Sequence, residues 1–217
     1  MLRFLILLIA FLLISACQHK AVVDSEQSSQ AWLSDTAYFD SKSAAIAKRD
    51  SWRYAAKVGV TTPSQREQAN LVWQRNPADN GKRLNEVRLF GPLGVGAVRL
   101  NFDDSGAVLY DQKGVEHYGQ TAEQLLTGIV GWPIPIDALS SWLFAVPFGS
   151  VSYRYQLDQD GNLAVLEQYG WRIEYSTYRD YDGLLMARKI VASRELLQPN
   201  SQELATISVK LIAKSLK

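Results

Sequence analysis

Few side chains in this 217-residue sequence have the type and spacing that catalysis or metal binding requires. With two histidines, His19 and His117, and one cysteine, the sequence has no histidine-cysteine cluster with zinc-ligand spacing. A Ser-His-Asp triad would need His117 as its base, but no GxSxG motif supplies the serine. Glu167 and Glu174 could form the carboxylate pair of a glycosidase if both lined one cleft; the alternative is a pair of surface glutamates on adjacent strands. The sequence therefore predicts no catalytic residue, no metal site and no cofactor.

The single cysteine, Cys17, follows an apolar N-terminal segment. Arg3 gives the segment a positive start, and every residue from Phe4 to Ile14 is apolar. This run is too short for a membrane-spanning helix, which needs roughly 20 residues, but it is typical of a secretory signal peptide. The sequence ISAC at 14–17 resembles the bacterial lipobox, which implies cleavage before Cys17 and acylation of that residue. The alternatives are an ordinary signal peptide beside an unrelated cysteine and an uncleaved signal anchor.

Acylation of Cys17 would divide the chain into a signal peptide (1–16), a lipid-anchored tether (17–29) and a folded domain (30–217). Residues 18–29 read QHKAVVDSEQSS, a polar composition that suits a tether between a membrane and a domain. Each buried methylene contributes about 0.8 kcal/mol, so several acyl chains would hold the protein durably at a membrane. Gln18 stands where aspartate would, by resemblance to lipoproteins of diderm bacteria, retain the protein at the inner membrane. We therefore expect the inner leaflet of the outer membrane, with the domain facing the periplasm.

The composition is that of a folded domain without excess charge. Removal of the signal peptide would leave 22 basic and 22 acidic residues, because Arg3 is one of the 23 basic residues. A chain without net positive charge is a poor ligand for nucleic acid. Apolar residues make up 47% of the sequence, enough to fill a core without disulfides. We expect no nucleic-acid partner and a monomer.

Alternation of apolar and polar residues predicts roughly ten short β-strands. In Trp52–Val60 every second residue is apolar or aromatic, while Arg53 and Lys57 face the other side, as in a half-buried strand. The other predicted strands cover 68–74, 83–90, 95–102, 107–111, 152–157, 163–168, 172–178, 184–192 and 205–212. Turn residues separate them at 80–81, 104–106, 158–161, 182–183 and 199–200. Short strands joined by hairpin turns indicate an antiparallel sheet curled toward a barrel.

Three helices are predicted beside the strands. Apolar residues at helical spacing favour one over 30–49. A second begins with the capping-box spacing of Thr121 and Gln124 and stops at Gly131. A third runs from Asp137 to Val146, after the proline-containing link 132–135. The last two are short and apolar, and they would either fill the interior of the sheet as core or cover its opening.

Several motifs follow one another along the chain. Besides the lipobox and Trp52 at the start of the first strand, they are GPLG at 91–94, Leu125-Leu126, GWPIP at 131–135, LSSW at 139–142, Pro147 and QYGWRIEY at 168–175. In their order and spacing these motifs resemble the LolB family of outer-membrane lipoproteins. The resemblance extends over residues 30–212.

The resemblance implies a fold and a function. The fold is mainly β with helices (α+β): an unclosed antiparallel β-barrel with a helical lid over an apolar cavity that accepts acyl chains. The function is to take cargo lipoproteins from a soluble periplasmic carrier, which belongs to the related LolA family, and to insert them into the outer membrane. Because the carrier has no lipid anchor, Cys17 favours the receptor.

The resemblance and the strand pattern together indicate two groups of site residues. The loop of Gly91, Pro92, Leu93 and Gly94 matches a family loop associated with delivery of cargo to the membrane, so Leu93 is predicted to contact lipid. Its alternative is to fold back onto the barrel. The residues predicted to line the acyl cavity, each of which could instead be packed core, are Trp52, Val58, Trp73, Leu89, Leu100, Leu126, Trp132, Ile134, Trp142 and Tyr175.

Two other functions remain open at this point. One is an outer-membrane lipoprotein that acts as a structural scaffold in an assembly machine, with a filled barrel and no ligand cavity. The other is a periplasmic hydrolase, which would need His117 or a carboxylate pair inside a cleft. No charged residue can be assigned to docking of the carrier.

Overall fold

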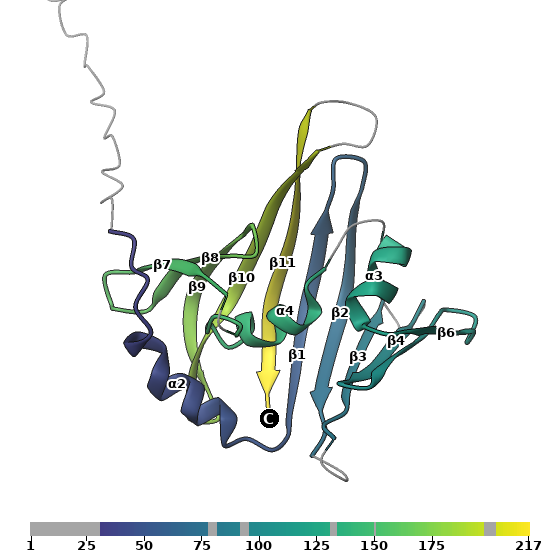
Figure 1. Ribbon diagram of the computed structural model, residues 1–217, viewed down its shortest axis with the longest axis horizontal. Helices are drawn as coiled ribbons and strands as arrows, with labels where there is room; N and C mark the ends of the chain where they lie inside the picture. Colours follow the sequence, from purple (N-terminus) through teal and green to yellow (C-terminus); the bar gives the residue numbers. More distant parts are fainter. Residues whose placement is uncertain (1–30, 78–81, 92–95, 131–133, 150, 198–202) are drawn as a thin grey trace, which may run out of the picture. The chain divides into compact units, whose positions relative to one another are not determined.

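The computed structural model describes residues 31–77, 82–91, 96–130, 134–149, 151–197 and 203–217 (Figure 1). The predicted signal peptide, Cys17 and the tether lie outside these residues.

Eleven antiparallel strands form one sheet in the described part of the chain. Their order in the sheet is β6-β5-β4-β3-β2-β1-β11-β10-β9-β8-β7. The strands are β1 (Trp52–Thr61), β2 (Arg66–Arg75), β3 (Asn85–Phe90), β4 (Val98–Asp103), β5 (Gly106–Tyr110), β6 (Glu116–Gly119), β7 (Tyr153–Leu157), β8 (Leu163–Gln168), β9 (Trp171–Tyr181), β10 (Leu184–Leu197) and β11 (Leu204–Leu216). Since β6 and β7 are the two ends of this order, the sheet is unclosed, as predicted.

The strands form because their side chains alternate between a buried and an exposed face. In β1, Trp52, Tyr54 and Ala56 are buried while Arg53 and Lys57 are exposed. Tight turns keep consecutive strands paired. Between β9 and β10, for example, Asp182 and Gly183 both have positive φ, which suits the right-handed twist of a hairpin.

Consecutive strands alternate in direction, so every second connection lies at the same edge of the sheet. We call the edge that carries the β1–β2, β3–β4, β8–β9 and β10–β11 connections the β1–β2 edge (Figure 1). The β2–β3, β4–β5, β7–β8 and β9–β10 connections lie at the opposite edge.

Three helices accompany the sheet in the described residues: α2 (Ala37–Ala47), α3 (Ala122–Val130) and α4 (Ile136–Trp142). The predicted cap of α3 is confirmed, because the Gln124 N–H donates to Thr121 Oγ1 over 3.1 Å. Gly119 at the end of β6 allows α3 to approach closely, since a Cβ there would lie 2.7 Å from Leu125 Cγ. The inner face of the sheet is the one that α3 and α4 cover (Figure 1).

The predicted elements are found with shifted ends. The first helix begins at Ala37 rather than residue 30, because Leu33 pairs with Tyr155 of β7 as an isolated antiparallel bridge. The third ends at Trp142 rather than Val146, since Ala145 adopts a positive φ of 54° that no α-helix continues. Strand β6 was not predicted.

Candidate functional site

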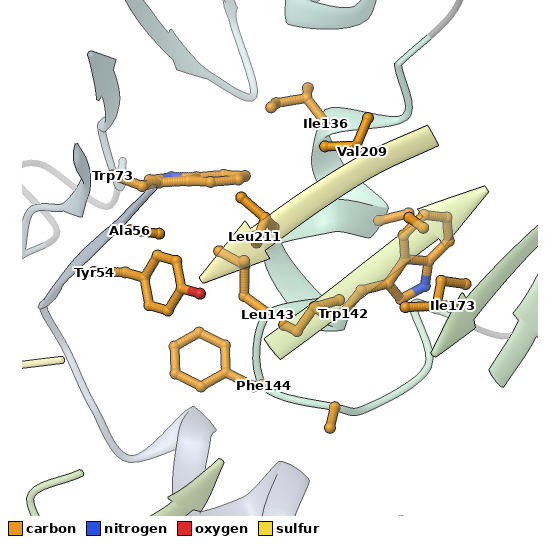
Figure 2. Close-up of a cluster of buried hydrophobic side chains, with 14 of the residues drawn as sticks. Tyr54, Ala56, Trp73, Ile136, Trp142, Leu143, Phe144, Ile173, Val209 and Leu211 are labelled. Atoms are coloured by element: carbon orange, nitrogen blue, oxygen red, sulfur yellow. The ribbon is translucent and has the colours of Figure 1, made fainter. Parts of the chain in front are cut away.

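The space between the sheet and the helices is partly hollow. A cavity of about 370 Å³ lies between the inner face of β1–β4 and β11 and the side chains of α3, α4 and the residues beside α4. Its apolar lining consists of Val58, Val60, Ala69, Leu71, Trp73, Val87, Leu89, Val98, Leu100, Leu126, Ile134, Ile136, Leu139, Leu143, Val209 and Leu211. Figure 2 shows Ile136 and Leu143 facing the β11 side chains Val209 and Leu211.

One end of the cavity is polar. Its polar lining residues, Thr62, Gln65, Glu67 and Gln68, all come from the β1–β2 hairpin and its flanks. Gln65, Glu67 and Gln68 are exposed and Thr62 is half-buried, whereas Trp73, Leu100 and Leu211 at the other end are buried. The cavity therefore opens toward solvent at the β1–β2 edge and closes toward the middle of the sheet. We call its polar end the mouth.

Aromatic side chains fill the interior beyond the closed end. The Trp52 ring lies 5.9 Å from the Trp73 ring and 5.2 Å from the Phe144 ring, measured between centroids. The Trp73 ring continues the cluster to Phe102 at 6.1 Å. Trp73 thus has core on one side and the cavity on the other, and it marks the boundary between them.

A buried glutamine fixes the segment that follows α4. Gln168 of β8 accepts hydrogen bonds from Trp142 Nε1 (3.0 Å) and from the Phe148 backbone N–H (2.9 Å). Its side-chain amide donates to the Phe148 carbonyl (2.9 Å) and the Val151 carbonyl (3.2 Å). Gln168 thus bonds Trp142, which precedes Leu143, and Phe148, which follows it. These bonds fix the segment to β8 and keep Leu143 at the cavity wall.

The structure separates the residues that were predicted to line the cavity into three groups. Val58, Trp73, Leu89, Leu100, Leu126 and Ile134 lie at its wall. Trp52, Trp142 and Tyr175 lie in the packed core instead; burial raises the pKa of Tyr175 well above its usual value, as expected for a phenol surrounded by apolar side chains. Trp132 lies outside the described residues, and so do Pro92, Leu93 and Gly94 of the predicted membrane-contact loop. Gly91 directly follows β3 at the β1–β2 edge and is half-buried.

Sequence reasoning missed several wall residues and the polar mouth. Val60 and Leu71 share the inward register of Val58 and Trp73, so alternation within the same two strands already contained this signal. Thr62 and Glu67 follow the same alternation at the hairpin end of β1 and β2, so their side chains also line the cavity. Gln168 belongs to the QYGWRIEY motif, but its partners in the segment after α4 could not be predicted, because the sequence does not show which distant groups its side chain bonds.

The candidates for catalysis lie on the surface. His117 is exposed on the edge strand β6, with its Nε2 3.3 Å from Asp111 Oδ2. Glu167 and Glu174 lie on the adjacent strands β8 and β9, where both contact the Arg172 guanidinium at 3.1 Å. The two glutamates are therefore held in ion pairs on the outer face of the sheet.

A larger groove of about 930 Å³ runs over β7–β10 near the β8–β9 turn. Its walls include Arg154, Glu167 and Arg172, which are linked by ion pairs. Five of its fourteen lining residues are charged, whereas the smaller cavity has charge only at Glu67, so we take the smaller cavity as the candidate site for an apolar ligand.

Two further searches cover the described residues only. None of their helices is both long and apolar enough to cross a bilayer. Nor do they contain a group of three or more histidine, cysteine, aspartate or glutamate residues placed to hold a metal ion.

Comparison with known proteins agrees with the resemblance seen in the sequence. The family model described as outer membrane lipoprotein LolB matches residues 50–215. The chain is 33% identical over 146 residues to the outer-membrane lipoprotein LolB of Pseudomonas paraeruginosa, covering 67% of this chain and 68% of that protein. It is 32% identical to the protein of the same name from Pseudomonas syringae pv. syringae, with the same coverage.

One solved structure supports the fold. A DUF1329 family protein from Desulfovibrio piger superposes with a TM-score of 0.54 at 8% identity, covering 84% of this chain and 92% of that one. At this identity the likeness concerns the fold alone.

Proposed function

The chain belongs to the LolB family of outer membrane lipoproteins, and on this premise we propose that it receives lipoproteins from a periplasmic carrier and inserts them into the outer membrane. In this proposal the cavity shelters acyl chains of the cargo during transfer. Cys17, acylated, anchors the protein at the inner leaflet of that membrane, facing the periplasm.

The apolar cavity is the observation that supports this proposal most directly. Sixteen of its twenty lining residues are apolar, and the four polar ones are confined to the mouth. An acyl chain needs an enclosure of this kind, because each methylene exposed to water costs about 0.8 kcal/mol. The polar mouth suits the other end of the cargo, where the acyl chains join a hydrophilic polypeptide.

The volume of the cavity limits how much of the cargo it holds. A methylene group is similar in size to a water molecule, which takes about 30 Å³ in the liquid, so 370 Å³ has room for about a dozen methylene groups. That is about one acyl chain, whereas a triacylated lipoprotein carries three. We expect α3 and α4 to move away from the sheet as the remaining chains enter.

Transfer runs down a gradient of affinity, because the periplasm supplies no ATP. The carrier binds the cargo least tightly, the receptor cavity more tightly and the bilayer most tightly. Leu93 contributes at the last step by touching the bilayer. Burial of one leucine is worth about 1.5–3 kcal/mol, far less than the acyl chains of Cys17 supply, so Leu93 perturbs the membrane locally rather than anchoring the protein.

The test is transfer of a labelled lipoprotein from a soluble LolA-like carrier to the full chain reconstituted in vesicles. We expect label first on the receptor and then in the lipid, together with saturable uptake of a fluorescent fatty acid by the receptor. A receptor that takes up neither fatty acid nor cargo would contradict the proposal. It would instead favour a scaffold role.

A further inference from the structure

Two leucines at the end of the longest hairpin are unusually exposed. Leu197, the last residue of β10, is 68% exposed, and Leu204, the first residue of β11, is 62% exposed. They are direct cross-strand partners in the antiparallel ladder. Their side chains therefore lie side by side on one face and form a small apolar surface, which we call the leucine tip.

The leucine tip has no role in packing the domain. Pairing of β11 with β1 ends at Ser208 and Thr61, so the residues of β11 before Ser208 pair only with β10. Leu196 and Ala205, one step inward from the tip, belong to the inner face, and Leu196 packs against the core. Leu197 and Leu204 point to the opposite, outer face.

The leucine tip lies at the same edge of the sheet as the cavity mouth. In the strand order, the β1–β2 hairpin that carries the mouth stands between β3 on one side and the β10–β11 pair on the other (Figure 1). These strands end at different heights: β3 stops at Phe90, opposite Asn70 of β2, whereas β11 extends four residues beyond its last pair with β1, Ser208 with Thr61, and pairs with β10 as far as Leu204. The leucine tip therefore projects beyond the mouth.

We propose that the leucine tip inserts into the outer-membrane lipid and is a second membrane contact, on the opposite side of the mouth from the β3–β4 connection. The mouth would then face the bilayer, and cargo would leave it directly into lipid. This inference goes beyond the proposed function, which requires only that the domain reaches the membrane.

The shape of the tip favours lipid over a protein partner. A stable protein interface buries about 800 Å² on each partner and relies on aromatic or arginine anchors in matching pockets. Two leucines on a projecting hairpin provide neither the area nor such anchors. A bilayer accepts an apolar projection without a complementary surface, and the relatives of the chain are outer-membrane proteins.

The experiment places an environment-sensitive fluorophore at the tip of the full chain, in vesicles of phosphatidylethanolamine and phosphatidylglycerol. Leu197→Cys and Leu204→Cys provide the attachment sites, since acylation would block the only native thiol, at Cys17. Leu185→Cys is the matched control, because Leu185 is 48% exposed at the opposite end of the same strand, β10.

We expect blue-shifted emission and quenching by bromine-labelled lipid at positions 197 and 204, but not at 185. Unshifted emission at the tip in vesicles would overturn the proposal. A shift that occurs only after addition of the LolA-like carrier would also overturn it and would assign the tip to carrier docking.

A functional measurement separates this inference from the proposed function. Two fully buried leucines strengthen partition by roughly two to four decades, and a tip that reaches only the interface gains part of this. We therefore expect the double variant Leu197→Ser, Leu204→Ser to slow delivery of cargo to vesicles by about tenfold, with fatty-acid uptake unchanged. If the unmodified chain takes up no fatty acid, the proposed function alone is refuted. If the double variant delivers cargo to vesicles at the normal rate, this inference alone is refuted.

Discussion

Filling the cavity from its wall should stabilise the protein and at the same time weaken acyl binding. Ala69 on the inner face of β2 lines the cavity and is half-buried. Ala69→Phe adds six carbon atoms, and at up to about 30 Å³ for each they occupy as much as half of the 370 Å³. The new ring would take space that the proposed ligand needs.

The two effects have opposite signs and can be estimated separately. Filling a cavity commonly raises stability by about 0.5–2 kcal/mol. A fatty acid that loses burial of only two methylene groups binds more weakly by about 1.6 kcal/mol, which is roughly fifteenfold in Kd. We therefore expect Ala69→Phe to raise the melting temperature while it weakens binding of a fluorescent fatty acid at least tenfold.

Ala55→Phe provides the matched control for this experiment. Ala55 is also half-buried, but it lies in β1 on the outer face of the sheet, paired with Val72. Fluorescence titration and thermal melting of the two variants should show weakened binding for Ala69→Phe only. Equal affinities in both variants would refute acyl binding in this cavity, and a lower melting temperature for Ala69→Phe would show that the space is not available to a side chain.

Three further changes test other parts of the structure. Gln168→Leu leaves the Trp142 and Phe148 N–H donors without their partner, so chemical denaturation should show a loss of at least about 2 kcal/mol; an unchanged free energy of unfolding would contradict the role given to Gln168. Burial lowers the pKa of Lys42 to about 8, from 10.5 in the unfolded chain. The buried charge therefore destabilises the fold fully below pH 8, and this loss of stability decreases as the pH rises from 8 to 10.5. Lys42→Met should therefore raise the melting temperature at pH 7 by a margin that shrinks by pH 9.5, and a margin that grows with pH would be inconsistent with this cause. Leu93→Glu should slow delivery of cargo to vesicles without affecting fatty-acid uptake, and delivery at the normal rate would exclude a membrane contact by Leu93.

The strands could be predicted from the sequence because burial of one sheet face leaves a period of two. The prediction for 163–168 coincides with β8, and that for 52–60 differs from β1 by one residue. Strand β6, with the sequence EHYG, was missed because three of its four residues are exposed and none is buried. Its strand conformation depends on pairing with β5, which no local pattern encodes.

The same period of two could not separate the cavity from the core. Trp52 and Val58 have equivalent inward positions in one strand, yet Trp52 is packed against Phe144 while Val58 faces open space. The difference arises from the path of the segment after α4, which brings Phe144 over one end of β1 but not over the other. That path depends on the tertiary hydrogen bonds of Gln168 and leaves no trace in the local sequence.

The pairing of β1 with β11 also determines at which stage of folding the cavity is completed. Two meanders, β1–β6 and β7–β11, are each built from consecutive strands, and this pair joins them through residues far apart in sequence. Contacts of such long range form slowly, because closing a long loop costs entropy before any contact repays it. Val60 and Val209 are partners across this seam and both line the cavity, so the cavity is incomplete until the two halves of the sheet have joined. Appearance of fatty-acid binding during refolding would therefore time that final step.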